Sequence, residues 1–329
     1  YDRVTVIKGN RTVVYGGGGS GGTVLFERDW LEIPERGYTA ELSGSYRENG
    51  DQWGVGADVA IGGEEGYLRF ITHKGASGDY EDGAGTRIDS EYDSKSNALL
   101  GGIRLSENTT LEMSYEKADE EDVEFPGARM NSPYADAENS RIKLEHLFTQ
   151  GALRQLDIEL YRSDVIHLMD NSMMSSPSTS LTTGGRIVLD ASLADIDWTV
   201  GVDQQKNNRE AVAYMVSNGM AAFSQWPGVS LRQTGFFVEG EKALGQDDLL
   251  KMGLRYDRVK ANAGRASDSF GMMGAATPVN LYSAQYGTTD VSSTENNVGG
   301  FASWTPRLNH DYSLETTLSR SVRTADATE

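Results

Sequence analysis

The strongest constraint on the fold of this chain is a series of segments in which apolar residues occupy every second position. The first two are residues 38–47 and 52–61, and Asn49-Gly50-Asp51 between them is a hairpin signal. Such alternation is typical of strands with one apolar face. Each segment is near the ~9 to 11 residues that a tilted strand needs to cross a membrane. The eleven that follow are residues 66–73, 97–105, 109–117, 139–148, 153–165, 185–193, 195–205, 232–243, 249–260, 297–305 and 312–322.

The connections between these segments alternate in length. After the first hairpin, short turns and longer polar connections follow one another without exception. Outer-membrane barrels show this asymmetry, with short periplasmic turns and longer extracellular loops, whereas a soluble β-sandwich is not expected to sort its loops by length. The chain is therefore predicted to be all-β, with residues 37–329 forming part of a transmembrane antiparallel β-barrel. The predicted extracellular loops are residues 73–96, 118–137, 167–183, 206–231 and 261–295.

The predicted number of strands is odd and too small for a large plugged barrel. Single-chain bacterial barrels close with an even number of strands, and transporters with a plugged lumen have roughly 22. We therefore expect about 13 of roughly 22 strands here. The chain carries no start methionine and no signal peptide, so we expect a piece of a longer precursor, and the missing leader says nothing about location.

The composition excludes several classes of function and of metal site. The formal net charge of −19 argues against a nucleic-acid partner. No apolar run approaches the ~18 to 20 residues of a spanning helix. Because these 329 residues contain no cysteine, thiolate metal sites, disulfides and cysteine nucleophiles are excluded within them. A soft-metal site in this sequence would have to use methionine and histidine.

A glycine-rich block, residues 16–22, separates two β-rich runs near the start of the chain. A phosphate-binding loop would need a lysine followed by Ser or Thr after the glycines, but Thr23 is followed by Val24. A flexible linker matches the composition but not the flanking β-branched runs. We favour a tight crossing between two strands, where glycine permits positive φ and close backbone approach.

The order and spacing of the first residues resemble a known family. The run Tyr1-Asp2-Arg3-Val4-x-Val6-Ile7-Lys8-Gly9, followed by Tyr15-Gly16-x-Gly18-x-x-Gly21-Gly22-Thr23-Val24, resembles the end of the plug domain of TonB-dependent outer-membrane receptors. Asn10-Arg11 departs from the Pro-Gln that the family usually carries. Residues 319–329 resemble a mid-barrel segment of the same receptors.

This resemblance implies a domain organisation, a location and partners. Residues 1–36 would be the C-terminal end of the plug, and residues 37–329 the N-terminal part of the barrel. The protein would lie in the outer membrane of a Gram-negative cell, in contact with the lipid bilayer and lipopolysaccharide. It would be coupled to the TonB protein of the inner membrane, and it would be a transporter and not an enzyme.

Methionines are concentrated in the predicted loops. Since residues i and i+2 of an extended backbone project to the same face, His167 and Met169 can present an imidazole and a thioether to one ion. This soft, neutral pair suits Cu(I). The alternatives are a hydrogen-bonded histidine at a strand end and methionines that fill gaps between loops. The loop methionines are Met130, Met169, Met173, Met174, Met215, Met220, Met272 and Met273.

The wider run DxxHxMDN resembles the TonB-dependent copper receptors, in which an HxM pair binds copper together with methionines from elsewhere. The resemblance carries the ligand role to His167 and Met169, and to Met130 in the preceding loop. It also implies a Cys and a Met from the plug, upstream of Tyr1. We therefore expect a copper ion receptor whose cargo is copper, without a catalytic cofactor.

Two other functions stay open. A receptor of the same architecture for a siderophore would place aromatic and arginine side chains in its loops, and residues 206–231 contain Arg209, Tyr214, Phe223 and Trp226. The third class is a barrel enzyme or a passive porin, and a passive pore would lack the plug-like run. The first 28 residues argue against that third class.

Overall fold

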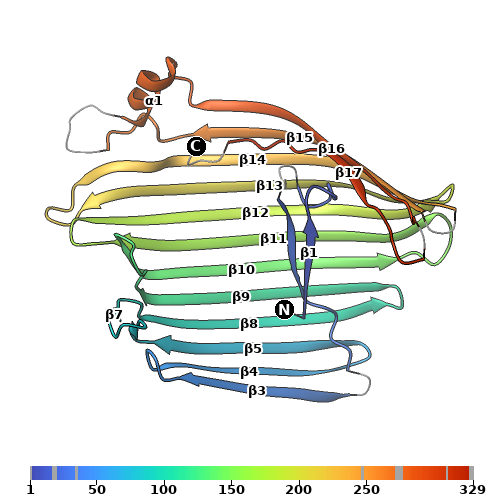
Figure 1. Ribbon diagram of the computed structural model, residues 1–329, viewed down its shortest axis with the longest axis horizontal. Coiled ribbons are helices and arrows are strands. Elements are labelled where there is room, and N and C mark those ends of the chain that lie inside the picture. The colour runs from blue at the N-terminus through green and yellow to red at the C-terminus, as the bar shows by residue number, and fades with distance from the viewer. Residues whose placement is uncertain are drawn as a thin grey trace.

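The computed structural model describes residues 2–16, 21–33, 36–245, 248–270, 277–308 and 310–325. Its main feature is a thirteen-stranded antiparallel sheet in which strands adjacent in the sequence are adjacent in space (Figure 1). The predicted fold class and strand count are therefore confirmed. The strands are β3 (Gly37–Arg47), β4 (Gln52–Gly63), β5 (Gly66–Ser77), β8 (Tyr92–Ser106), β9 (Thr109–Val123), β10 (Asn131–Leu147), β11 (Leu153–Asp170), β12 (Met174–Leu193), β13 (Ile196–Met215), β14 (Ala221–Leu244), β15 (Asp248–Ala263), β16 (Ser292–Thr305) and β17 (Thr316–Arg320).

Smaller elements complete the described chain. A two-stranded sheet pairs β1 (Arg3–Lys8) with β2 (Gly22–Glu27), and a second one pairs β6 (Tyr80–Glu81) with β7 (Arg87–Ile88). The helix α1 (Pro278–Tyr286) is capped at its N-terminus by Thr277, whose side chain accepts a hydrogen bond from the Asn280 N–H. Within the described residues, no helix is long and apolar enough to cross a membrane.

Several strands are longer than the sequence predicted. β12 and β13 each contain 20 residues and β14 contains 24, so much of the predicted loops 167–183 and 206–231 is strand. Beyond the apolar band both faces of a barrel strand are wet, so the alternation of hydropathy stops while the backbone ladder continues. Met169, Met174 and Met215 consequently lie in strands. Met272 and Met273 lie outside the described residues.

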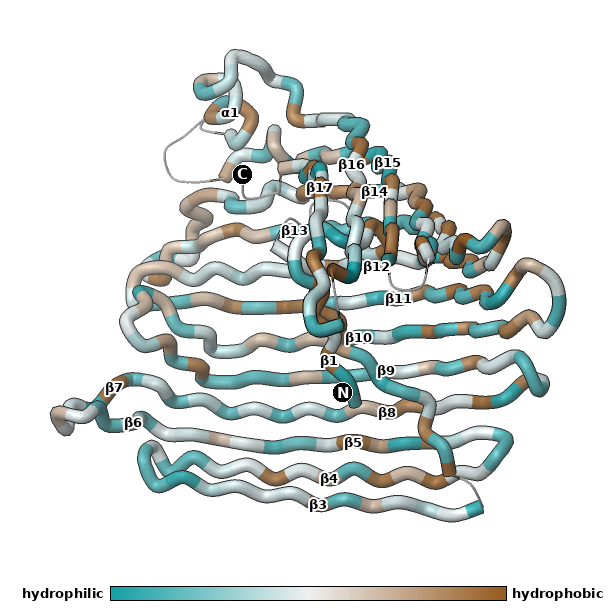
Figure 2. Tube along the Cα trace, turned by 45° about the vertical axis from the view of Figure 1, so that its right-hand side comes forward, coloured by the Kyte–Doolittle hydropathy of each residue, from teal (hydrophilic) through white to brown (hydrophobic). Residues whose placement is uncertain are grey.

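The outward face of the sheet carries an apolar band. One row of directly paired residues joins Ile187, Val202, Phe236, Tyr256 and Val298 across β12 to β16. Exposed aliphatic and aromatic side chains are unfavourable in water but suit a lipid-facing wall. Figure 2 shows apolar residues interspersed with polar ones along the strands, as expected where the two faces alternate.

The β1–β2 hairpin runs across the concave side of the sheet, at a steep angle to the barrel strands (Figure 1). Gly22 begins β2 with φ of 135°, and a Cβ built there would lie 2.5 Å from the Ile7 carbonyl oxygen. Only glycine fits this approach. The predicted tight crossing is therefore confirmed at Gly22, and a phosphate-binding loop is excluded because the residues after the glycines form a strand. Residues 17–20 of the glycine block lie outside the described residues.

Candidate metal site at the extracellular end of the barrel wall

The segment between β1 and β2 is docked on the inner wall and identifies which face is the lumen. Val13 packs with Val188, Phe237 and Phe301 in the core cluster of the described residues. On the same face, Glu239 accepts hydrogen bonds from the Thr12 hydroxyl at 2.6 Å and from the Val13 N–H. Residues that share this face therefore point into the barrel.

A buried arginine completes this contact. Arg255 is 1% exposed and donates to the Val13 carbonyl at 3.1 Å, and it forms ion pairs with Asp203 and Asp257 at 2.7 Å each. At the opposite side of the lumen, Arg69 joins Asp2 to Asp58, and Arg28 pairs with Glu116. The hairpin is thus held at both ends by charged groups of the wall.

The inner face of β11 carries the predicted ligands His167 and Met169. Glu159 on this strand pairs with Arg186, whose guanidinium lies 5.2 Å from the ring of Tyr15 in the hairpin segment, so Glu159 faces the lumen. The β11–β12 register is regular from Gln155 to Asp170. His167 and Met169 are even numbers of residues from Glu159, so they face the lumen too.

The surroundings of His167 and Met169 are polar, and no side chain of the described residues hydrogen-bonds to the imidazole. Ser178, directly opposite on β12, donates its hydroxyl to the backbone carbonyl of His167 at 3.2 Å. Met169 lies opposite Ser176, whose hydroxyl donates to Gln225 at 2.8 Å. Both serine hydroxyls therefore donate to oxygen atoms, and neither donates to the imidazole or the thioether.

Met130 precedes β10 by one residue, and the next residue, Asn131, pairs with Asp170 at the end of β11. The register therefore brings Met130 beside the end of the strand that carries His167 and Met169. Met130 also lines an open hollow of about 670 Å³, together with Asp170 and Asn171. The structure brings these three predicted residues to one end of neighbouring strands.

The sequence did not reveal a pairing of two further methionines. Met174 on β12 lies directly opposite Met215 on β13, and the register continues the lumen-facing rows of both strands. Directly opposed residues have Cβ atoms about 4.5–5.5 Å apart. Only the strand register could have found this pair, because the sequence placed the two residues in separate loops.

The aromatic and arginine group considered for a siderophore lies on strands and not in a loop. Arg209 on β13 stacks over Trp226 on β14, with the guanidinium carbon 5.7 Å from the ring centroid. Tyr214 and Phe223 are exposed. Of the other histidines, His146 has a structural role, since its Nδ1 lies 2.8 Å from the Thr109 hydroxyl and its ring packs edge-on against Phe148.

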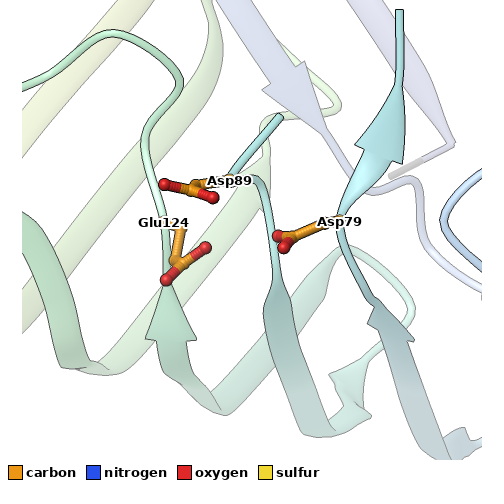
Figure 3. Close-up of side chains that lie close together, drawn as sticks. All are labelled: Asp79, Asp89 and Glu124. Carbon is orange, nitrogen blue, oxygen red and sulfur yellow. The ribbon is translucent and has the colours of Figure 1, made fainter. Parts of the chain in front are cut away.

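Three carboxylates meet in the loops beside β6 and β7. Oxygen atoms of Asp79, Asp89 and Glu124 lie within 4.8 Å of one another (Figure 3). Asp79 already accepts hydrogen bonds from the Ser90 and Glu91 N–H groups and from Arg87. Such oxygen donors suit hard cations and not a soft one.

The pKa values of two of these carboxyls shift in opposite directions. The Ser90 N–H and the Arg87 guanidinium lower the pKa of Asp79. Partial burial and the charges of Asp79 and Asp89 raise the pKa of Glu124 above its usual 4.5. The stabilising contribution of Glu124 is therefore present below about pH 4.5 and is lost as the pH rises through its raised folded pKa.

Glu124→Gln is accordingly expected to slow amide hydrogen exchange in residues 79–91 at pH 7, because it removes a charge that Asp79 and Asp89 repel. At pH 4, below the usual and the raised pKa of Glu124, the exchange rates of the variant and of the native protein should differ less than at pH 7. Exchange measured by mass spectrometry, corrected for intrinsic rates, checks this. If the variant and the native protein exchange at equal rates at pH 7 as well as at pH 4, the proposed charge repulsion at Glu124 is contradicted.

Comparison with known proteins gives structural relatives only. No family model and no curated protein sequence matches the chain. Among solved structures, the copper transporter OprC is similar with a TM-score of 0.83 and 25% identity, over 99% of this chain and 51% of that one. The alcaligin outer-membrane receptor FauA from Bordetella pertussis matches with a TM-score of 0.70 and 17% identity, over 96% and 49%. The FrpB iron transporter from Neisseria meningitidis matches with a TM-score of 0.70 and 17% identity, over 99% and 53%.

The fold and these likenesses define the class. The chain has the structure of a partial barrel of the TonB-dependent outer-membrane receptors, and its place is the outer membrane of a Gram-negative cell. It spans about half the length of the structures it matches. These relatives are transporters and receptors, and they differ in cargo.

Proposed function

We propose that this chain belongs to a copper receptor that captures the ion at the cell surface through His167, Met169 and Met130. The observation that carries the proposal is the placement of His167 and Met169 on the lumen face of β11, at the end where Met130 enters β10. An imidazole and two thioethers form a soft, uncharged donor set, which suits Cu(I) better than Fe(III) or Zn(II). The likeness to a copper transporter supports the same cargo.

In this proposal residues 1–36 are the end of a plug domain and residues 37–329 the first part of the barrel. The docked hairpin supports this division, since it forms a sheet of its own inside the wall. Energy would come from TonB in the inner membrane, and the bilayer and lipopolysaccharide would surround the apolar band. Release requires an affinity that depends on conformation. The site would weaken when ligands contributed by the plug withdraw from His167 and Met169. The copper ion is cargo, and no catalytic cofactor is needed.

The second candidate function is uptake of a ferric siderophore, which the Arg209–Trp226 stack supports. Uptake assays separate the two. Cells that express the full-length receptor should accumulate copper from copper salts above the level of cells with an empty vector, and should gain no iron from ferric chelates. Iron gain without copper gain would replace the copper proposal with the siderophore one.

A further inference from the structure

A cavity of about 490 Å³ lies between the docked hairpin segment and the inner wall. Its wall side includes Asp190 near the end of β12 and Leu249 near the start of β15. Both positions are close to the short turns, which are the periplasmic turns of an outer-membrane barrel. The cavity therefore occupies the periplasmic half of the lumen, below the candidate metal site.

The strand β11 runs from the cavity to the candidate metal site. Asp157 lines the cavity and His167 lies ten residues further along the same lumen face, which corresponds to about 33 Å of strand. A cation released from His167 and Met169 toward the periplasm would travel along this wall.

The basic side chains that line the cavity are neutralised by carboxylates. Arg11 pairs with Glu315, and Lys251 pairs with Glu239 at 3.2 Å. Arg186 pairs with Glu159 at 3.2 Å. The fixed positive charges of the lining therefore do not repel a cation strongly.

One lining carboxylate has no such partner. Asp190 accepts a hydrogen bond from the Thr199 hydroxyl at 2.6 Å, and within the described part of the chain it forms no ion pair. Asp157 is within 3.5 Å of Lys143, yet its Oδ1 atom is buried without a hydrogen bond. Because one carboxylate is uncompensated, the cavity carries a net negative potential.

The donor chemistry of the cavity differs from that of the candidate metal site. None of the described lining residues is a methionine or a histidine. Carboxylates and hydroxyls are hard donors and hold a soft cation only weakly. The lining can attract a cation by its charge without binding it tightly.

We propose that this cavity is a transit compartment for a small hydrated cation, and that Asp190 is the group that draws the ion into it. Its volume equals that of roughly sixteen water molecules at about 30 Å³ each, which is room for an ion with its first hydration shell. The proposal rests on the proposed copper transport only for the identity of the cation.

The test uses the full-length receptor with Leu249→Cys at the cavity lining, where the side chain is 36% exposed. Labelling of residue 249 by a cationic and by an anionic methanethiosulfonate is followed by mass spectrometry. The cationic reagent should react faster, and Asp190→Lys should lower the cationic-to-anionic rate ratio by about tenfold or more, because it changes the nearby charge by two units. Asp93→Lys on β8, an exposed carboxylate four strands away from β12 in the sheet, is the matched control and should leave the ratio almost unchanged.

Copper accumulation in cells is measured on the same variants without the cysteine. Asp190→Lys should slow entry severalfold while the purified receptor binds as much copper as the native protein. A labelling ratio that Asp190→Lys leaves unchanged overturns the proposal, whatever happens to copper entry. If the ratio falls but the native receptor takes up no copper, the compartment stands and the proposed copper function fails.

Discussion

Replacing His167 and Met169 together by alanine is expected to remove high-affinity copper binding from the full-length receptor. The two side chains face the lumen on one strand, so in the proposed site both bind the same ion. Loss of an outer-shell partner of a metal ligand typically costs about 10–100-fold in affinity, and loss of two ligands should cost more. Copper per receptor, measured after dialysis against a weak chelator, checks this. Met130→Leu should have a smaller effect, because it removes one donor and leaves the paired two.

A matched double variant controls for general damage. His146→Ala with Met113→Ala removes the same two residue types from places without the proposed role, since His146 contacts Thr109 and Met113 is an exposed side chain of the outer face. That variant should bind copper like the native protein. Full copper binding by the His167/Met169 variant would reject the site.

Arg255→Met is expected to destabilise the barrel wall and the docked hairpin more than any surface substitution. It leaves Asp203 and Asp257 without their shared cation and the Val13 carbonyl without its donor. Removing one partner of a buried ion pair typically costs about 3–5 kcal/mol. Thermal unfolding in detergent, followed by circular dichroism, should show a clear fall in the transition temperature.

Two variants test whether the loss of stability is caused by the carboxylates that Arg255→Met leaves without a cation. Adding Asp203→Asn and Asp257→Asn to Arg255→Met should recover much of the loss, because no unpaired charge then remains. Arg162→Met breaks an ion pair with Asp164 in which Arg162 is 57% exposed, and such pairs contribute about 0–1 kcal/mol. If Arg255→Met and Arg162→Met unfold at the same temperature, the buried ion-pair network stabilises the protein no more than the exposed pair does.

The site was predictable only in part. Alternation along a strand is local, so His167 and Met169 were assigned to one face from the sequence. The pairing of Met174 with Met215 joins residues that the sequence placed in separate loops. It depends on strands that continue beyond the apolar band, where the hydropathy pattern no longer reports them.

Local patterns in the sequence predicted the fold class, the number of strands and the glycine crossing, because periodicity and turn chemistry act over a few residues. The tertiary structure decided which distant groups meet. Thr12 reaches Glu239 across 227 residues, and Val13 reaches Arg255 across 242. Such contacts arise from curvature of the sheet around the hairpin, and no local pattern encodes them. The charge of Asp190 is uncompensated because the fold pairs the neighbouring basic side chains with other carboxylates, which likewise depends on the tertiary structure.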